Sequence, residues 1–106
     1  MRVKPIFNFA QMVADATTEF LAENKGMRVE GMAEYALLIQ GKKGEEQLKQ
    51  ALERGELSEV QIKGAIKNLL QAAGERARAR GSTVITDDDI RHCIPAGKRP
   101  YPLGIA

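Results

Sequence analysis

This sequence holds one cysteine, no tryptophan and few aromatic residues of any kind. A single cysteine excludes a disulfide framework, a four-cysteine zinc site and an iron–sulfur site built by one chain alone. Aromatic residues make up only 5% of the chain, whereas β-rich domains draw heavily on aromatic and β-branched side chains. The frequent residues are instead Ala, Glu, Gln, Lys, Arg and Leu, which favour helices. Composition therefore predicts an all-α fold.

Long apolar runs are also missing. No stretch approaches the ~20 apolar residues of a membrane helix, and the first residues lack the apolar core of a signal peptide. We therefore expect a cytoplasmic protein with no membrane partner. The net charge of +2 permits binding to nucleic acid and does not by itself argue for it.

Glycine and capping residues divide the 106-residue chain into about five expected helices. Asn8, Ser58 and Thr86 are placed to cap the first, fourth and fifth, and a glycine follows most of the helix ends. The expected helices span 9–23, 30–40, 45–54, 59–80 and 87–94, and the fourth is the long central one. We expect a single helical domain over 1–94 and a C-terminal tail over 95–106, which contains three prolines and two glycines.

None of the chemically suggestive clusters has the spacing that catalysis or metal binding requires. Neighbouring residues on a helix diverge by about 100°, so Asp87-Asp88-Asp89 and His92-Cys93 do not converge on one ion or one substrate atom. Three acids in a first turn instead offset the helix dipole. The Gly41-Lys42-Lys43-Gly44 stretch lacks the pattern of a Walker phosphate loop. We therefore expect no enzymatic activity, no cofactor and no metal.

Basic residues concentrate late in the chain. From residue 76 to the end there are six cations against three acids, whereas residues 1–53 carry seven basic and eight acidic groups. Phosphate contacts require cations and little sequence specificity. The late cluster makes Arg78, Arg80, Lys98 and Arg99 candidates for nucleic-acid contacts. The alternative is that the cations in the last turn of the fourth helix offset its dipole.

The stretch 57–94 resembles the histone fold. In that fold a long central helix ends in basic residues, a short extended loop follows, and an acidic–aliphatic pair opens a short last helix. Here the same order is Arg78-Ala79-Arg80, Val84-Ile85-Thr86 and Asp89-Ile90. The resemblance implies a structural clamp in which Arg76 or Arg80 pairs with Asp89. It also implies a non-enzymatic module that dimerises and binds duplex DNA through backbone contacts.

The same stretch is also similar to the helical lid domain of AAA+ ATPases. The corresponding positions are Ser58, Ile62-Lys63, Ala72-Ala73 and Ile85-Thr86. This second resemblance implies an adaptor or assembly subunit that binds a protein partner and has no nucleic-acid role. Both interpretations stay open on sequence alone.

The expected fourth helix also suggests a homodimer. Its apolar residues fill an arc of about 180° when placed at 100° per residue, wider than the ~100° stripe that packing on one side of a small core requires. Either the first three helices or a second copy must cover the surplus. The arc consists of Ile62, Ala65, Ile66, Leu69, Leu70, Ala72, Ala73, Ala77 and Ala79.

Overall fold

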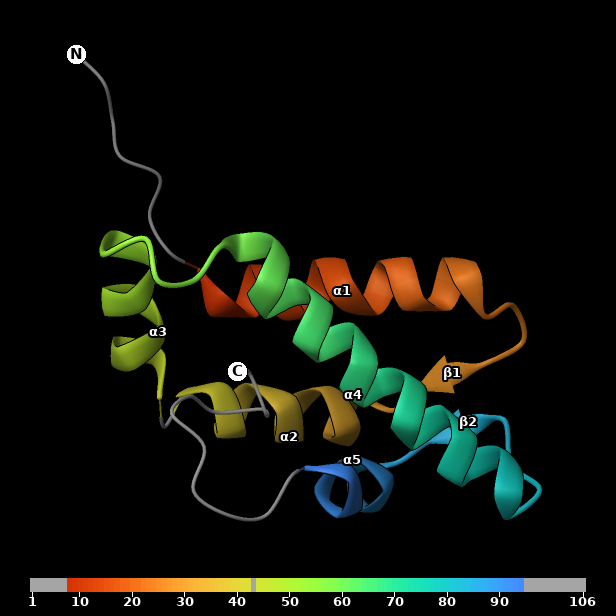
Figure 1. The fold of residues 1–106 in the computed structure, drawn as a ribbon. Coiled ribbons are helices and arrows are strands. Elements are labelled where there is room, and N and C mark those ends of the chain that lie inside the picture. The colour runs from red at the N-terminus through yellow and green to blue at the C-terminus, as the bar shows by residue number, and fades with distance from the viewer. Residues whose placement is uncertain (1–7, 43, 95–106) are drawn as a thin grey trace.

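The computed structural model describes residues 8–42 and 44–94 of the chain. Within them the fold consists of five helices and one pair of two-residue strands, which confirms the predicted all-α class. None of the described helices is long and apolar enough to cross a membrane. The elements (Figure 1) are α1 Phe9–Glu23, β1 Arg28–Val29, α2 Gly31–Lys42, α3 Glu45–Glu53, α4 Glu59–Ala79, β2 Val84–Ile85 and α5 Asp87–Cys93.

The three predicted helix starts are confirmed. Asn8 accepts a hydrogen bond from the backbone N–H three residues on, at 3.1 Å. Ser58 and Gln61 form a complete capping box, as do Thr86 and Asp89, so that each side chain bonds the backbone N–H of the other. These bonds satisfy donors that a helix start otherwise leaves free.

Several helix boundaries differ by one or two residues from the expected ones, since α2 begins at Gly31, α3 ends at Glu53 and α5 ends at Cys93. Helix α2 runs through Gly41 to Lys42 instead of stopping at Gln40, because glycine inside a helix costs only about 1 kcal/mol relative to alanine. Helix α4 ends at Ala79, and Arg80 is its C-cap residue.

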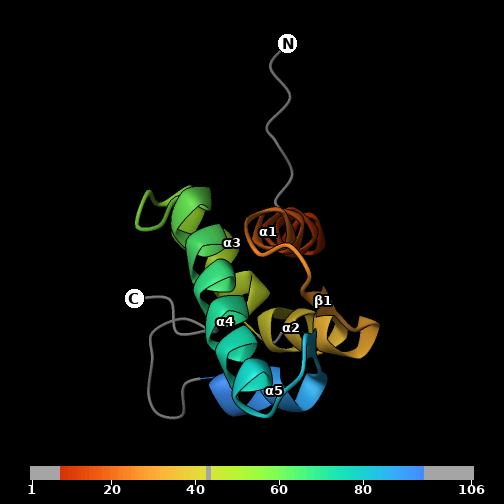
Figure 2. The same ribbon diagram turned by 90° about the vertical axis from the view of Figure 1, so that its right-hand side faces the viewer.

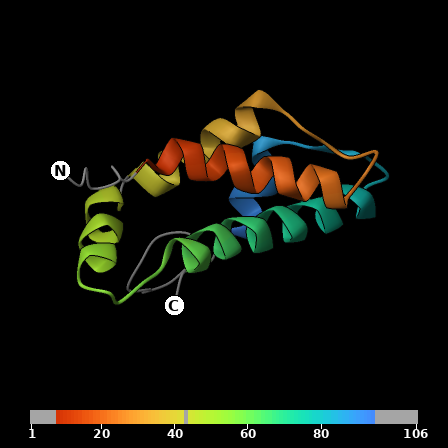
Figure 3. The same cartoon turned by 90° about the horizontal axis from the view of Figure 1, so that it is seen from above.

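The described elements follow the order helix–strand–helix twice, with α3 between the two halves. Strand β1 pairs in parallel with β2, Arg28 opposite Val84 and Val29 opposite Ile85, a constant separation of 56 residues. Each helix also packs against its counterpart in the other half, α1 against α4 and α2 against α5 (Figures 1 and 3). The sequence predicted an extended loop at 84–86 and a connector at 27–29, and nothing in it signalled that the two would pair.

The apolar arc of α4 is covered within the chain. Helix α1 lies along it, and two ion pairs tie the helices together, Lys63 with Glu19 and Lys67 with Glu23. Only the small residues Ala72 and Ala79 of the arc remain exposed, and Ala65 is half-buried. The helix that suggested a dimer therefore offers no large apolar face to a second copy. The arc residues in the core are Ile62, Ile66, Leu69, Leu70, Ala73 and Ala77.

Candidate nucleic-acid interface

Asp89 is the centre of a charged cluster that joins the end of α4 to the start of α5. Its side chain is 0% exposed. The carboxylate accepts hydrogen bonds from Arg76 Nη1 at 2.8 Å, Arg80 Nη2 at 2.5 Å and Arg80 Nε at 3.3 Å. It also accepts from the backbone N–H and the hydroxyl of Thr86, at 3.0 and 3.2 Å. The structure thus brings together all three residues of the clamp that the resemblance implied.

The hydrogen bonds from Arg80 are the main reason why the pKa of Asp89 lies well below its ordinary value. Burial acts in the opposite direction, because it disfavours a charged carboxylate. Arg80 Nη2 also donates to the backbone carbonyl of Val84 at 2.9 Å. Arg80 therefore links α4, β2 and α5, and a buried carboxylate offsets its charge.

The remaining predicted nucleic-acid contacts fall in different places. Arg78 is exposed at the last turn of α4, and its Nη2 donates to Asn24 Oδ1 at 3.3 Å, across to the end of α1. Lys98 and Arg99 lie outside the described residues.

Strand pairing brings two further cations to the same end of the molecule. Lys25 and Arg28 are exposed on the segment after α1, and the backbone N–H of Arg28 donates to the carbonyl of Thr83 at 2.9 Å. Figure 2 looks onto this end, where β1 and β2 lie side by side. We call the two segments 24–30 and 78–86 the loop pair. Sequence reasoning missed Lys25 and Arg28 because the first half of the chain has balanced charge and no signal of the strand pairing.

Three of these cations have no ion-pair partner in the described part of the chain, namely Lys25, Arg28 and Arg78. Nearby carboxylates are largely engaged elsewhere, since Glu23 pairs with Lys67 at 2.6 Å. Glu30 is the acid within the loop pair, and its field acts on Arg80. The loop pair therefore presents a small net positive surface.

His92 and Cys93 lie in different surroundings at the end of α5, His92 exposed and Cys93 half-buried. His92 Nδ1 lies 3.4 Å from the carboxylate of Asp88, its neighbour one turn earlier on an exposed helix face. Cys93 is half-buried against the core, and burial raises the pKa of its thiol, the opposite of what a nucleophilic cysteine requires. Among the described residues, no group of three or more His, Cys, Asp or Glu side chains is arranged to hold a metal ion.

No protein-family model, curated protein or solved structure matches this chain.

Proposed function

We propose that this chain is a non-enzymatic, histone-like helical module that acts as a homodimer and binds duplex DNA through its phosphate backbone. The loop pair is the proposed contact surface. The observation that carries the proposal is that Lys25, Arg28 and Arg78, which have no ion-pair partner among the described residues, lie together at one end of the molecule. These cations come from both halves of the chain.

The side chains of the loop pair suit contacts with the phosphate backbone of DNA better than contacts with base edges. Exposed Lys and Arg side chains neutralise phosphates without reading sequence. The strand pairing and the Arg80–Asp89 cluster hold the backbone that carries these cations, so less entropy is lost when DNA binds.

The proposal gives a quantitative salt dependence. For each copy that contacts the DNA, three phosphate contacts predict that log K falls by about 2.7 for each tenfold rise in salt, roughly a fortyfold loss of affinity between 50 and 200 mM. A fluorescence anisotropy titration of random-sequence duplex DNA at these two salt concentrations measures it. A lack of binding in the micromolar range at low salt would rule out the proposal.

A pair of matched variants locates the contact surface. Arg28→Gln should weaken binding to all sequences alike and reduce the salt slope by about 1. Lys49→Gln is the control, because Lys49 is exposed on α3 at the opposite end of the molecule (Figure 1). Equal effects of the two substitutions would show that the attraction is diffuse and that the loop pair is not the site.

A second candidate function is a protein–protein adaptor with a lid-like helical domain and no nucleic-acid role. It is favoured by a specific observation, the exposed apolar side chains Met32, Tyr35 and Ile39 on α2, since exposed apolar patches mark interaction surfaces. The same DNA titration separates the two functions, because the adaptor predicts no binding at either salt concentration.

A further inference from the structure

Helix α2 is apolar on more than one side. Ala33 and Leu37 face the core and are fully buried. Met32, Tyr35 and Ile39 follow one another at spacings of three and four, which places them on one face, and they are 59%, 55% and 38% exposed. We call these three residues the α2 stripe. They are three of the four large apolar side chains that stand exposed in the described part of the chain, the fourth being Val60 on α4.

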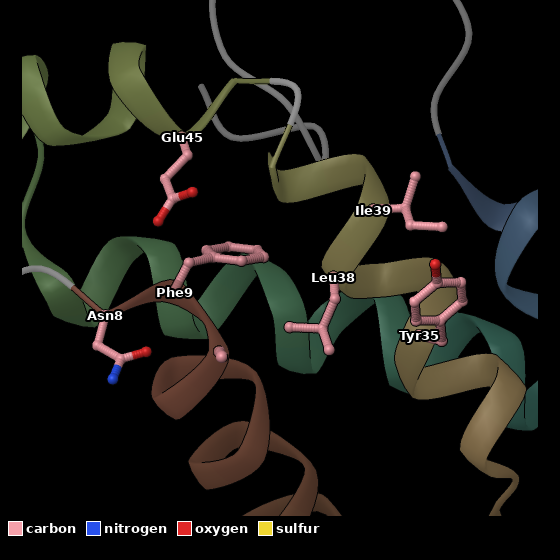
Figure 4. A pocket seen from close by; sticks show the side chains of 7 residues that line it. Asn8, Phe9, Tyr35, Leu38, Ile39 and Glu45 are labelled. Carbon is pink, nitrogen blue, oxygen red and sulfur yellow. The ribbon is translucent and has the colours of Figure 1, made fainter.

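Open hollows lie on both sides of the α2 stripe. One is formed between α2 and the start of α1, where Phe9 and Leu38 line its floor and Glu45 its rim. Figure 4 shows this hollow, with Tyr35 and Ile39 projecting side by side from α2. The other lies between α2 and α5 and is lined by Met32, Tyr35, Ala36, Ile39, Asp87 and Arg91.

We infer that the α2 stripe is the contact between two copies of this chain. The surface carries both protruding apolar side chains and the hollows beside them. The protruding side chains of a second copy can therefore fill the hollows of the first. A two-fold axis that passes beside Tyr35, the middle residue of the stripe, places the two Tyr35 side chains next to each other, each against a hollow of the other copy. This inference rests on the dimeric state in the proposed function and moves the contact from α4 to α2.

The charged residues that line the hollow between α2 and α5 are also complementary to a second copy of themselves. Asp87 and Arg91 lie one turn apart on α5 and are joined at 2.6 Å within one copy. With the two-fold axis perpendicular to α5, the two α5 helices run in opposite directions, so that Arg91 of each copy lies beside Asp87 of the other. The ion pairs of the single chain then become shared between copies.

The size of the stripe predicts a weak dimer. A half-exposed Met or Tyr leaves on the order of 100 Å² uncovered, so the stripe contributes roughly 300 Å² per copy. A standard stable interface buries about 800 Å² per partner. The flanking residues of α1 and α5 add to the stripe, and we expect a dissociation constant in the micromolar range.

Light scattering over a concentration series, without DNA, tests the inference. The mass should rise from 11.6 kDa toward twice that value with concentration. Tyr35→Glu should weaken dimerisation at least tenfold, while the matched substitution Val60→Glu on the other exposed apolar side chain leaves it unchanged. Circular dichroism melts of both variants check that the fold is intact.

A covalent readout tests the two-fold geometry. In a Cys93→Ser background, Tyr35→Cys should form a disulfide between copies under mild oxidation, and Val60→Cys should not. A monomer at every concentration, or a dimer that persists in Tyr35→Glu, would overturn the α2 interface. Both outcomes are independent of the DNA titration, so failure here is distinguishable from failure of DNA binding.

Discussion

Arg80 and Asp89 are joined by hydrogen bonds of 2.5 and 3.3 Å from the two nitrogens Nη2 and Nε of one guanidinium. Arg80 caps the end of α4, and Asp89 is in the first turn of α5. This contact fixes the direction in which the chain leaves α4 and enters α5. It also sets the position of β2, because Arg80 holds the carbonyl of Val84.

Loss of the buried carboxylate should be costly. Asp89→Asn leaves Arg76 and Arg80 without their shared partner, and we expect the free energy of unfolding to fall by about 3 kcal/mol. Asp88→Asn is the control, since Asp88 is 58% exposed and pairs at the surface with Arg76 at 3.3 Å and with His92 at 3.4 Å. An exposed pair of this kind contributes less than about 1 kcal/mol. Urea unfolding of the two variants compares them, and similar losses would contradict the central role of Asp89.

Acid should destabilise the protein through the same group. The pKa of Asp89 in the folded state lies well below its ordinary value of 3.8, so the folded state binds the proton less readily than the unfolded state. Its stabilising contribution is complete above pH ~4 and declines as the pH falls below that value. Urea unfolding across this range should show a steeper loss in the parent than in Asp89→Asn. Parallel curves would assign the acid sensitivity to other carboxylates.

Two glycines within α4 should respond in opposite ways to alanine. A Cβ at Gly64 meets nothing within 4 Å, so Gly64→Ala should raise stability by about 0.5–1 kcal/mol. A Cβ at Gly74 would lie 3.3 Å from the ring of Phe20 and 3.7 Å from Ile85 and Met27. Gly74→Ala should therefore cost about 1 kcal/mol by overpacking where α1 meets α4. Thermal melts measure the stability of both variants. An equal gain in stability from the two substitutions would mean that α1 moves aside to make room for the new Cβ at position 74.

Cys93 should behave as a packing residue. Burial raises the pKa of its thiol, which lowers the thiolate fraction at neutral pH. Alkylation by iodoacetamide should be slower than that of a small unhindered thiol and should speed up when urea unfolds the chain. A rate above that of the free thiol would contradict this assignment.

The local elements could be predicted from the sequence because their signals are local. Ser58 and Thr86 each stand three residues before the side chain that completes the cap, and Gly26 and Gly81 adopt positive φ angles of 92° and 78° just beyond the ends of α1 and α4. Such turns favour glycine, which has no Cβ to clash. Each of these features depends on residues within one or two turns of one another.

The surface features could not be predicted in the same way, because they depend on contacts between distant segments. Lys25 and Arg28 join Arg78 only once β1 has paired with β2. Whether the apolar side chains of α2 or of α4 stay exposed is decided by where α1 packs. The sequence pattern of α4 indicated a wide apolar arc, and it held no information on which neighbour covers it.

The pairing of each element with its counterpart in the other half has a consequence for folding kinetics. Helices α1 and α4, helices α2 and α5, and the two strands pair across the halves, so a large part of the core forms only when both halves meet. The chain must close a loop of 56 residues before β1 meets β2, and such non-local contacts slow folding. We therefore expect this helical protein to fold more slowly than a bundle in which each helix packs on the next.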